Sequence, residues 1–425
     1  MRLSIRDDGG LAVHRSQIRR LASGTLISLA GTQAASIALV AAVYQRTDHS
    51  GAWLTVTLLT TFGVRALASP WGGALGDRFD RRAVMIVSNV CAAAAFVALA
   101  FARSPSAIVS LAGVASLAES PFPASSNALV AMLVPEQDRA WANALRSAAG
   151  YTGMFFGGLA GGALVAAAGA SSAFLVNAAS FVASAVIIAS VRGSFRAARG
   201  DHRKYEGVLA GFRHIARTPI LARSLGAIAL GLLGTGMINI AEYPLFVARG
   251  AGSAAYGIAI AAWAVGQVVG SRVARRLSSF KGERRGFITG WSATALTIGA
   301  VALIPVPAVM AVIFAFGGCG FSIASISSTL INQRGSDDAV RARVFGATAA
   351  LQQVAMGLSI LGGGILLSLS SPKTVFATAG VLGLIAAMSA NAIPKSFDES
   401  ALADHSETLA AQPALAGTRS GTRSP

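Results

Sequence analysis

The sequence predicts an all-α membrane protein with twelve transmembrane helices in two pseudo-symmetric six-helix halves. Of its 425 residues, 54% are hydrophobic and only 12% are charged, whereas a soluble domain carries about a quarter charged residues. The uncharged residues fall in runs of roughly 20, the length of helix that crosses the hydrocarbon of a bilayer. Because that hydrocarbon offers no water to the backbone, the runs are expected to be helices.

The expected spans divide the chain into two halves joined by a linker. The first half is 1–192, with a short N-terminal tail at 1–20, and the second is 223–395. The basic linker 193–222 places Val208, Leu209, Phe212 and Ile215 on one face, which predicts an amphipathic helix at the membrane surface. The polar tail 396–425 is expected to be disordered. The spans are 21–44, 52–75, 83–103, 107–131, 143–168, 172–192, 223–247, 254–274, 286–304, 308–331, 344–369 and 373–393.

Basic residues are distributed unevenly over the loops. Arg46, Arg103, Arg249 and Lys373 fall on one side and Arg65 lies within a span, while the other 30 of the 35 Lys and Arg lie on the opposite side. Positive residues are retained in the cytoplasm, so both termini are expected there, in the inner (plasma) membrane of a bacterium. Topology thus explains the net charge of +17, and nucleic acid is not an expected partner because no stacking aromatics accompany the charge.

Signals for catalysis and for cofactors are missing from the sequence. Cys91 and Cys319 lie in spans of different halves, so neither a disulfide nor a metal pair is expected. No His, Cys and carboxylate cluster has ligand spacing, and no GxxxxGK[ST] loop is present, so neither a metal nor an ATP-driven pump is expected. No nucleophile–base pair is visible, and we therefore expect neither an enzyme nor a cofactor.

The two halves share short matches at one offset. A shift of 202 positions places Arg139-Ala140 on Arg341-Ala342 and Gly161-Gly162 on Gly363-Gly364. Both matches join equivalent positions of the two halves, which is the repeat pattern of many secondary transporters.

The loop between the second and third spans carries the most specific motif. It matches the pattern Gly-x-x-x-Asp-Arg/Lys-x-Gly-Arg/Lys-Arg/Lys at Gly73, Asp77, Arg78, Arg81 and Arg82. This loop resembles the signature of the major facilitator superfamily. Its Asp-Arg-x-Asp-Arg-Arg form, with Asp80 in place of the usual Gly, is similar to the branch that contains macrolide-efflux and enterobactin-exporter proteins.

The resemblance covers nearly the whole chain and implies a role for the loop. Tyr256-Gly257 and Arg341 to Val344 are also similar to that branch. In the family the loop Asp bears on the start of the eleventh helix, where the helix dipole favours an acid. The resemblance therefore implies that Asp77 acts as a latch that holds the cytoplasmic side closed. Arg81 and Arg82 are explained equally well as basic residues that keep this loop on the cytoplasmic side. That explanation does not account for Asp77.

Glycines on the fifth span form a second motif, Gly153-x-x-x-Gly157-Gly158-x-x-Gly161-Gly162. It resembles the antiporter motif Gly-x-x-x-Gly-Pro-x-x-Gly-Gly, which implies export, with Gly158 in place of the Pro. Close packing of small residues between membrane helices explains the glycines equally well. The buried Arg that many drug:proton antiporters carry in the fourth span is missing, so their proton coupling cannot be carried over.

Polar residues form stripes on the first, fourth, seventh and tenth spans, which line the central cavity in the resembling family. Ser and Thr can satisfy themselves on the helix backbone, so much of this set is expected to be neutral lining. The candidates for the cavity wall are Thr32, Gln33, Ser116, Asn127, Asn239, Ser325 and Thr329.

Three ionisable residues within the spans need a more specific explanation. A charge at mid-bilayer costs several kcal/mol unless it is paired, hydrated or neutralised. Arg65 and Glu119 both lie near the midplane by residue count, so one interpretation is an ion pair that only fixes packing. The other interpretation is that Glu119, or Glu242 nearer the outer surface, carries a proton.

Together these patterns predict a secondary transporter that exports a small amphipathic molecule, such as a drug, siderophore or secondary metabolite. Proton antiport with alternating access is the expected mechanism. The expected partners are the substrate, protons and the lipid bilayer, and the chain is expected to be monomeric. Two alternatives stay open, an importer or symporter of the same fold and a non-transporting membrane sensor or assembly factor.

Overall fold

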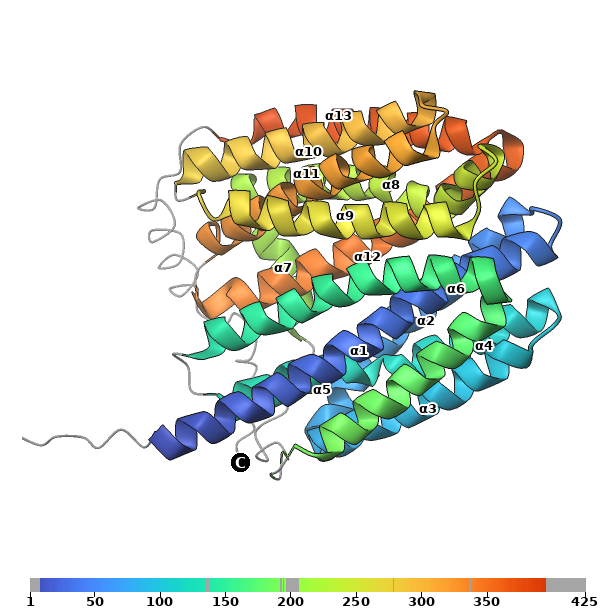
Figure 1. Cartoon of the computed structure of the whole chain (residues 1–425). Helices are drawn as coiled ribbons and strands as arrows, with labels where there is room; N and C mark the ends of the chain where they lie inside the picture. The colour runs from blue at the N-terminus through green and yellow to red at the C-terminus, as the bar shows by residue number, and fades with distance from the viewer. Residues whose placement is uncertain are drawn as a thin grey trace, which may run out of the picture.

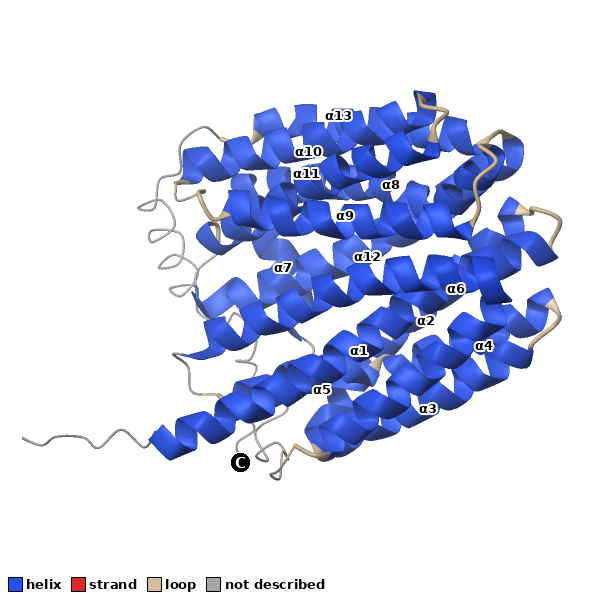
Figure 2. Cartoon of the chain, viewed as in Figure 1, coloured by secondary structure: helices blue, strands red, loops and turns tan. Residues whose placement is uncertain are grey.

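The computed structural model describes residues 8–134, 138–191, 193, 195, 206–277, 279–336 and 338–394. Within these ranges the regular secondary structure is entirely helical (Figure 2). The helices are α1 (Asp8–Arg46), α2 (Gly51–Arg78), α3 (Arg81–Phe101), α4 (Pro105–Glu119), α5 (Pro121–Leu133), α6 (Arg139–Ala189), α7 (Glu206–Arg217), α8 (Pro219–Ala248), α9 (Ser253–Ala274), α10 (Phe280–Leu303), α11 (Pro307–Arg334), α12 (Asp338–Leu369), α13 (Pro372–Ser389) and the 3₁₀ turn η2 (Ala390–Ala392).

The described part of the chain contains eleven helical segments that are long and apolar enough to span a membrane. They make twelve crossings, because one segment crosses twice. One segment is 45 residues long and contains Gly169 at φ 78°, a conformation that glycine adopts without steric cost. Arg15 pairs with Asp138 just before α6, and Arg20 donates to the carbonyl of Ser190 just after it. Both ends of α6 therefore lie at the same end of the bundle, so the chain reverses at Gly169. The predicted fold class is confirmed.

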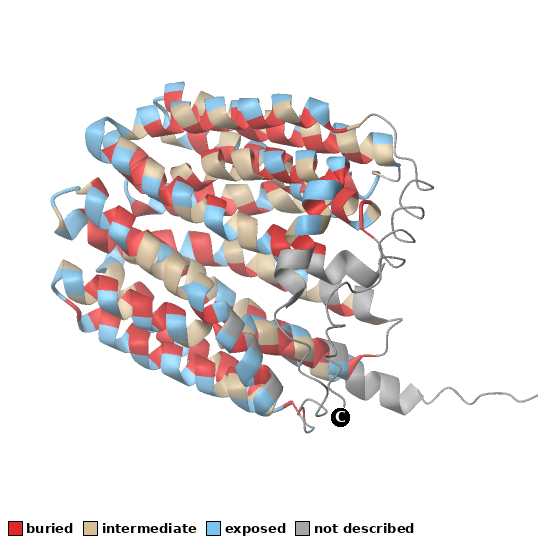
Figure 3. Ribbon diagram, turned by 180° about the vertical axis from the view of Figure 1, so that it is seen from behind, coloured by how far each residue is buried: buried red, intermediate tan, exposed pale blue. Residues whose placement is uncertain are grey.

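The two halves, α1–α6 and α8–α13, lie side by side with their helices running lengthwise (Figure 1). We call the end where α2 meets α3 and where α13 finishes the basic end, because most described Arg and Lys side chains lie there. The other end holds the α1–α2 and α3–α4 connections and is called the opposite end. The halves approach each other at the opposite end and spread apart toward the basic end (Figure 1). Buried residues, coloured red in Figure 3, occur along the helices of both halves.

Arginines that cap helix ends repeat between the halves. Each donates a hydrogen bond to a backbone carbonyl at the C-terminal end of a neighbouring helix, where carbonyls lack helical partners and a cation is favourable. The pairs are Arg20–Ser190, Arg46–Ala102 and Arg82–Val191 in the first half and Arg223–Ala392, Arg249–Ile304 and Arg284–Ile393 in the second. Each residue of the second set lies 202 or 203 positions after its counterpart. The offset found in two dipeptides thus extends to three tertiary contacts.

The fourth crossing is one candidate span, Pro105–Val130, close to the predicted 107–131, but its hydrogen-bond ladder is interrupted at Ser120, which keeps helical φ and ψ. Pro121 and Pro123 lack an N–H, so they cannot bond to the carbonyls one turn earlier. Ser120 takes over the carbonyl of Leu117 with its backbone N at 3.2 Å and its Oγ at 2.8 Å. The break makes Glu119 the last residue of α4. An ionised carboxylate within a membrane-spanning segment is costly unless a cation lies beside it.

The predicted linker helix is present as α7. Phe212 and Ile215 pack with Leu221 of α8 and Val344 of α12 in one apolar cluster. At these two positions the apolar face of α7 therefore packs against other helices of the protein, whereas the sequence predicted a helix at the membrane surface. The side chains of Val208 and Leu209 and the tail 396–425 lie outside the described residues.

Candidate functional site

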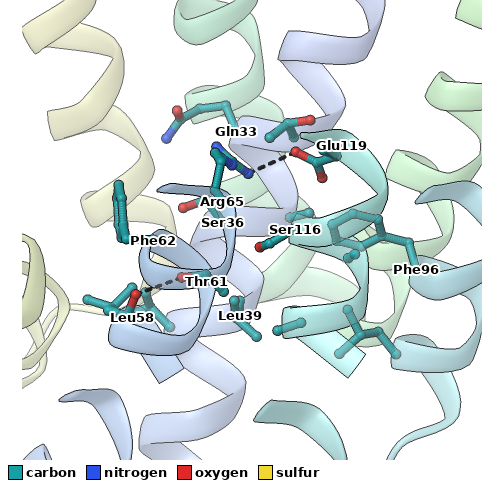
Figure 4. A pocket seen from close by; sticks show the side chains of 16 residues that line it. Gln33, Ser36, Leu39, Leu58, Thr61, Phe62, Arg65, Phe96, Ser116 and Glu119 are labelled. Carbon is teal, nitrogen blue, oxygen red and sulfur yellow. Dashed lines mark hydrogen bonds and ion pairs between the residues drawn. The ribbon is translucent and has the colours of Figure 1, made fainter. Parts of the chain in front are cut away.

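Two adjoining cavities lie in the interior of the bundle. The first, of about 210 Å³, is lined by α1, α2, α3 and α4 (Figure 4). The second, of about 560 Å³, lies between the halves and is lined by α2 together with α8, α10, α11 and α12. Phe62 and Arg65 of α2 belong to both walls. The cavities therefore meet at α2.

An ion pair occupies the wall of the first cavity. Arg65 Nη2 donates to Glu119 Oε2 at 2.9 Å, and both side chains point into the cavity in Figure 4. The Arg65 side chain is 46% exposed and that of Glu119 is 14% exposed. No other charged side chain of the described residues lines either cavity. The guanidinium supplies the cation that a carboxylate at the end of α4 requires.

The structure distributes the predicted polar lining unevenly. Thr32, Gln33 and Ser116 line the first cavity, and Ser325 and Thr329 line the second. These five predicted residues therefore lie in cavity walls, and their contact with a substrate stays a prediction.

The two predicted asparagines are placed differently and line neither of these two cavities. The Asn239 amide donates to the carbonyls of Thr235 and Gly236 on its own helix, at 3.4 and 3.2 Å. Asn127 Oδ1 accepts from Arg146 Nη1 at 2.6 Å. Both side chains are therefore engaged in fixed local contacts.

Arg146 was missed from the sequence, because it was counted with the basic residues at helix ends. Its Nε is buried without a hydrogen-bond partner. The following residues Ser147 and Gly150 line a third cavity, of about 340 Å³, which shares Thr32 and Gln33 with the first. A basic residue inside the predicted span 143–168 was the available signal.

Glu242 is held apart from these cavities, near the opposite end of α8. It is 7% exposed, and Tyr256 Oη of α9 donates to its Oε2 at 3.1 Å. The neighbouring ring of Tyr243 packs edge-on against those of Tyr44 and Tyr256, each at 5.8 Å between centroids. Gln45 Nε2 of α1 donates to Tyr243 Oη at 2.9 Å. These contacts join the two halves at the opposite end.

The loop motif is described only in part. The Arg78 guanidinium lies 5.7 Å from the centre of the Phe79 ring, and Arg81 Nη1 contacts the sulfur of Met132 at 2.8 Å. Arg82 caps the end of α6 at Val191. The side chains of Asp77 and Arg343, and the surroundings of Gly73, lie outside the described residues. The latch therefore stays a prediction.

Asp80, the departure from the family pattern, joins α3 to the chain that follows α6. Its Oδ1 accepts from the N–H of Ala83 at 3.1 Å and its Oδ2 from the N–H of Phe195 at 2.7 Å. Burial raises the pKa of this carboxyl, but the N–H groups of Phe195, Ala83 and Arg82 and the charge of Arg82 outweigh that effect. The pKa of Asp80 therefore lies below its ordinary value of 3.8.

The glycines of the fifth span pack α6 against two helices at once. Gly153, Gly157 and Gly161 face α1, where an added Cβ on Gly153 would lie 2.9 Å from a carbonyl oxygen. Gly158 and Gly162 face α9 of the other half, where a Cβ on Gly162 would lie 2.6 Å from a carbonyl oxygen. Close packing of small residues thus accounts for all five positions.

Comparison with known proteins assigns the family. The model of the Major Facilitator Superfamily matches residues 21–248. The chain belongs to the major facilitator superfamily. It is 26% identical over 381 residues to the uncharacterized MFS-type transporter YfiS of Bacillus subtilis, covering 85% of this chain and 89% of that protein. It is 31% identical over 134 residues to the multidrug resistance protein MdtG of Salmonella typhi, covering 31% of this chain and 33% of MdtG.

Solved structures show the same fold. The nucleoside transporter NupG matches with a TM-score of 0.70 and 14% identity over 89% of this chain and 98% of that chain. A bacterial homolog of the human lysosomal transporter Spinster, inward-facing and occupied, matches with a TM-score of 0.70 and 15% identity over 90% and 97% of the two chains. The protein is therefore an MFS transporter of small molecules, a multi-pass integral membrane protein, and not an enzyme.

Proposed function

We propose that this MFS transporter exports a small amphipathic molecule by proton antiport. The observation that supports this proposal is the ion pair of Arg65 and Glu119 in the wall where the two cavities meet. When Glu119 is ionised the pair is neutral, and when Glu119 takes up a proton the wall gains one positive charge. A titratable carboxyl beside a substrate cavity is what coupling a proton to a substrate requires.

The proposed cycle places the basic end in the cytoplasm, because positive residues are retained on that side. The state described would then face inward, since Gln45 and Tyr243 join the halves at the opposite end. The second cavity extends along α11 and α12 to Asn332 and Phe345, toward the basic end. Reporter fusions test this orientation, and reversal at two or more sites would contradict it. Fusions at Gly51, Ser106, Ala170 and Gly250 should report outside, and fusions at Gly200 and Ala401 should report inside.

Export is the favoured direction for two reasons. MdtG, which is named a multidrug resistance protein, matches a third of this chain. The Asp-Arg-x-Asp-Arg-Arg loop and the glycine motif of the fifth span also resemble those of exporters. The finer resemblance to the macrolide-efflux and enterobactin-exporter branch belongs to this proposal.

Uptake by proton symport is a second candidate, favoured by the exposure of the pair. Arg65 is 46% exposed and Glu119 only 14%, so an anionic substrate would meet the guanidinium first. An anion that displaced Glu119 from Arg65 would favour protonation of the acid, and the two would then move together. The sign of proton exchange separates symport from antiport.

Everted membrane vesicles with an acidic interior test the proposal. The amphipathic dye Hoechst 33342 should accumulate inside vesicles that contain the wild-type protein, driven by the pH gradient. Glu119→Gln should abolish gradient-driven accumulation while leaving dye binding in detergent intact. Glu242→Gln is the matched control, because it removes an acid that lines neither cavity. Unchanged accumulation in Glu119→Gln would move the proton site to Glu242. Unchanged accumulation in both variants would exclude both acids as the proton site. No gradient-driven movement in the wild type would support a non-transporting factor.

A further inference from the structure

The second cavity presents neutral polar groups and aromatic rings to a substrate. Arg65 is the one charged side chain of the described residues in its wall. Hydroxyl and amide oxygens can accept hydrogen bonds from a ligand, and aromatic faces attract cations. The polar lining residues are Ser325, Ser328, Thr329, Asn332, Thr348, Gln352 and Gln353, and the aromatic ones are Phe62, Trp291, Phe321 and Phe345.

Glu119 is screened from a ligand in that cavity. It lines only the first cavity, and Arg65 lies in the walls of both. A ligand in the second cavity therefore interacts with Glu119 through its charge, at some distance, and not by direct contact.

The titratable charge in this region is confined to one group. Of the elements packed around α4, α2 contributes Arg65, and α1 and α3 contribute no charged residue of the described chain to the first cavity. Arg146 of α6 is held at Asn127 of α5, and an arginine keeps its charge throughout. The net charge of the wall therefore changes with the protonation of Glu119 alone.

Protonation of Glu119 makes the cavity wall more positive, so the charge of the substrate decides whether substrate and proton bind together or compete. With Glu119 ionised, its negative charge behind the guanidinium offsets the charge of Arg65 that a cation in the second cavity meets. With Glu119 protonated, the same cation faces the uncompensated charge of Arg65. Two unit charges about 10 Å apart at an effective dielectric constant of about 20 repel enough to weaken binding about tenfold. A cation and a proton therefore exclude each other, whereas an anion and a proton would bind together.

We propose that the second cavity binds an amphipathic organic cation, and that the cation and the proton exclude each other through the charge of the Arg65–Glu119 wall without sharing a binding group. This inference rests on the proposed antiport, since antiport requires that the two ligands compete. Arg65 acts here as a positioning residue, because it keeps the ionised carboxylate out of contact with the ligand.

Three probes with one aromatic scaffold test the inference on the purified full-length chain. They are (1-naphthylmethyl)trimethylammonium, 1-naphthylmethanol and 1-naphthalenesulfonate. None of them titrates near neutral pH, so any proton exchanged on binding comes from the protein. Equilibrium dialysis gives the affinities, and a pH-indicator dye in weak buffer gives the protons. The trimethylammonium probe should bind most tightly, with proton release, and its affinity should rise with pH.

Substitutions in the pair give the matched comparison. Glu119→Gln should weaken binding of the trimethylammonium probe about tenfold, leave naphthylmethanol unchanged and abolish proton release. The double variant Arg65→Gln with Glu119→Gln restores a neutral wall, so cation affinity should recover without proton release. Arg103→Gln removes an arginine outside the cavity walls and should change neither quantity.

The outcomes separate the inference from the proposed function. If the cation does not bind more tightly than the other two probes, or if its affinity is the same in Glu119→Gln, the inference is wrong. If naphthylmethanol releases as many protons as the cation, antiport stands and the role of substrate charge fails. If the sulfonate binds most tightly and takes up protons, both the inference and antiport fail in favour of symport.

Discussion

A buried ion pair at the basic end of the second half offers a sharp test of how the cavity mouth is held together. Glu283 lies in the first turn of α10 and is 1% exposed. Its Oε1 and Oε2 accept from Arg334 Nε at 3.0 and 2.8 Å, and Arg334 ends α11 two residues after Asn332 of the cavity wall. The pair therefore joins two helices that line the second cavity.

The size of the effect of Glu283→Gln follows from this burial. Removing one charge of a fully buried pair costs about 3–5 kcal/mol, and the Arg334 side chain is 33% exposed, which reduces that penalty. Loss of an acid from the first turn of a helix adds about 0.3–1 kcal/mol. We expect Glu283→Gln to lower the free energy of unfolding by about 2–4 kcal/mol, measured by equilibrium unfolding in mixed detergent micelles.

The first half supplies the matched control. Arg15 and Asp138 are 4.0 Å apart, with side chains 56% and 20% exposed, and such a pair contributes less than about 1 kcal/mol. Asp138→Asn should therefore change the free energy of unfolding little. A double-mutant cycle of Glu283→Gln and Arg334→Gln should give a coupling energy of about 2 kcal/mol. A coupling near zero, or equal effects of Glu283→Gln and Asp138→Asn, would refute the reasoning.

Three further predictions concern the loop and the glycine contacts. The pKa of Asp80 in the folded protein lies below 3.8, so the ionised carboxylate stabilises the fold fully above pH 3.8 and this contribution is lost as the pH falls through the folded pKa. Asp80→Asn should therefore unfold more readily than wild type at pH 7. The difference in unfolding free energy between the two proteins should narrow below about pH 4. Gly157→Ala should destabilise by about 1–3 kcal/mol because its Cβ meets α1, whereas Gly226→Ala, with nothing within 4 Å, should not destabilise, and equal thermal unfolding of the two would contradict the packing. Asp77→Asn should slow transport with expression and substrate affinity little changed, because the outward-facing state loses about 1 kcal/mol or more; wild-type rates would end the latch prediction.

The sequence predicted the elements well because a bilayer restricts them strongly. Twelve apolar runs of span length leave few alternatives, and each corresponds to a crossing in the structure. Arg65 and Glu119 could be proposed as partners because charges inside spans are rare and both lay near the same depth. Residue counting along helices was sufficient for that inference.

The missed features depend on contacts that no local pattern records. Tyr256 was noted only as part of a family resemblance, although its hydroxyl holds Glu242. Arg146 lies near a span end and was counted with the basic residues that set topology, and Glu283, three residues before the predicted span 286–304, belonged to no sequence pattern. The break at Ser120 differs from these, because the prolines at 121 and 123 were a visible signal for it in the sequence.

The central claim is that Glu119 exchanges a proton against a substrate in the adjoining cavity. The most direct measurement uses liposomes at equal pH on both sides, with the membrane potential clamped and an imposed gradient of (1-naphthylmethyl)trimethylammonium. Protons should move opposite to the probe in wild-type liposomes, and this flux should vanish in Glu119→Gln. Proton movement in the same direction as the probe, or an unchanged counterflow in a well-folded Glu119→Gln protein, would contradict the claim.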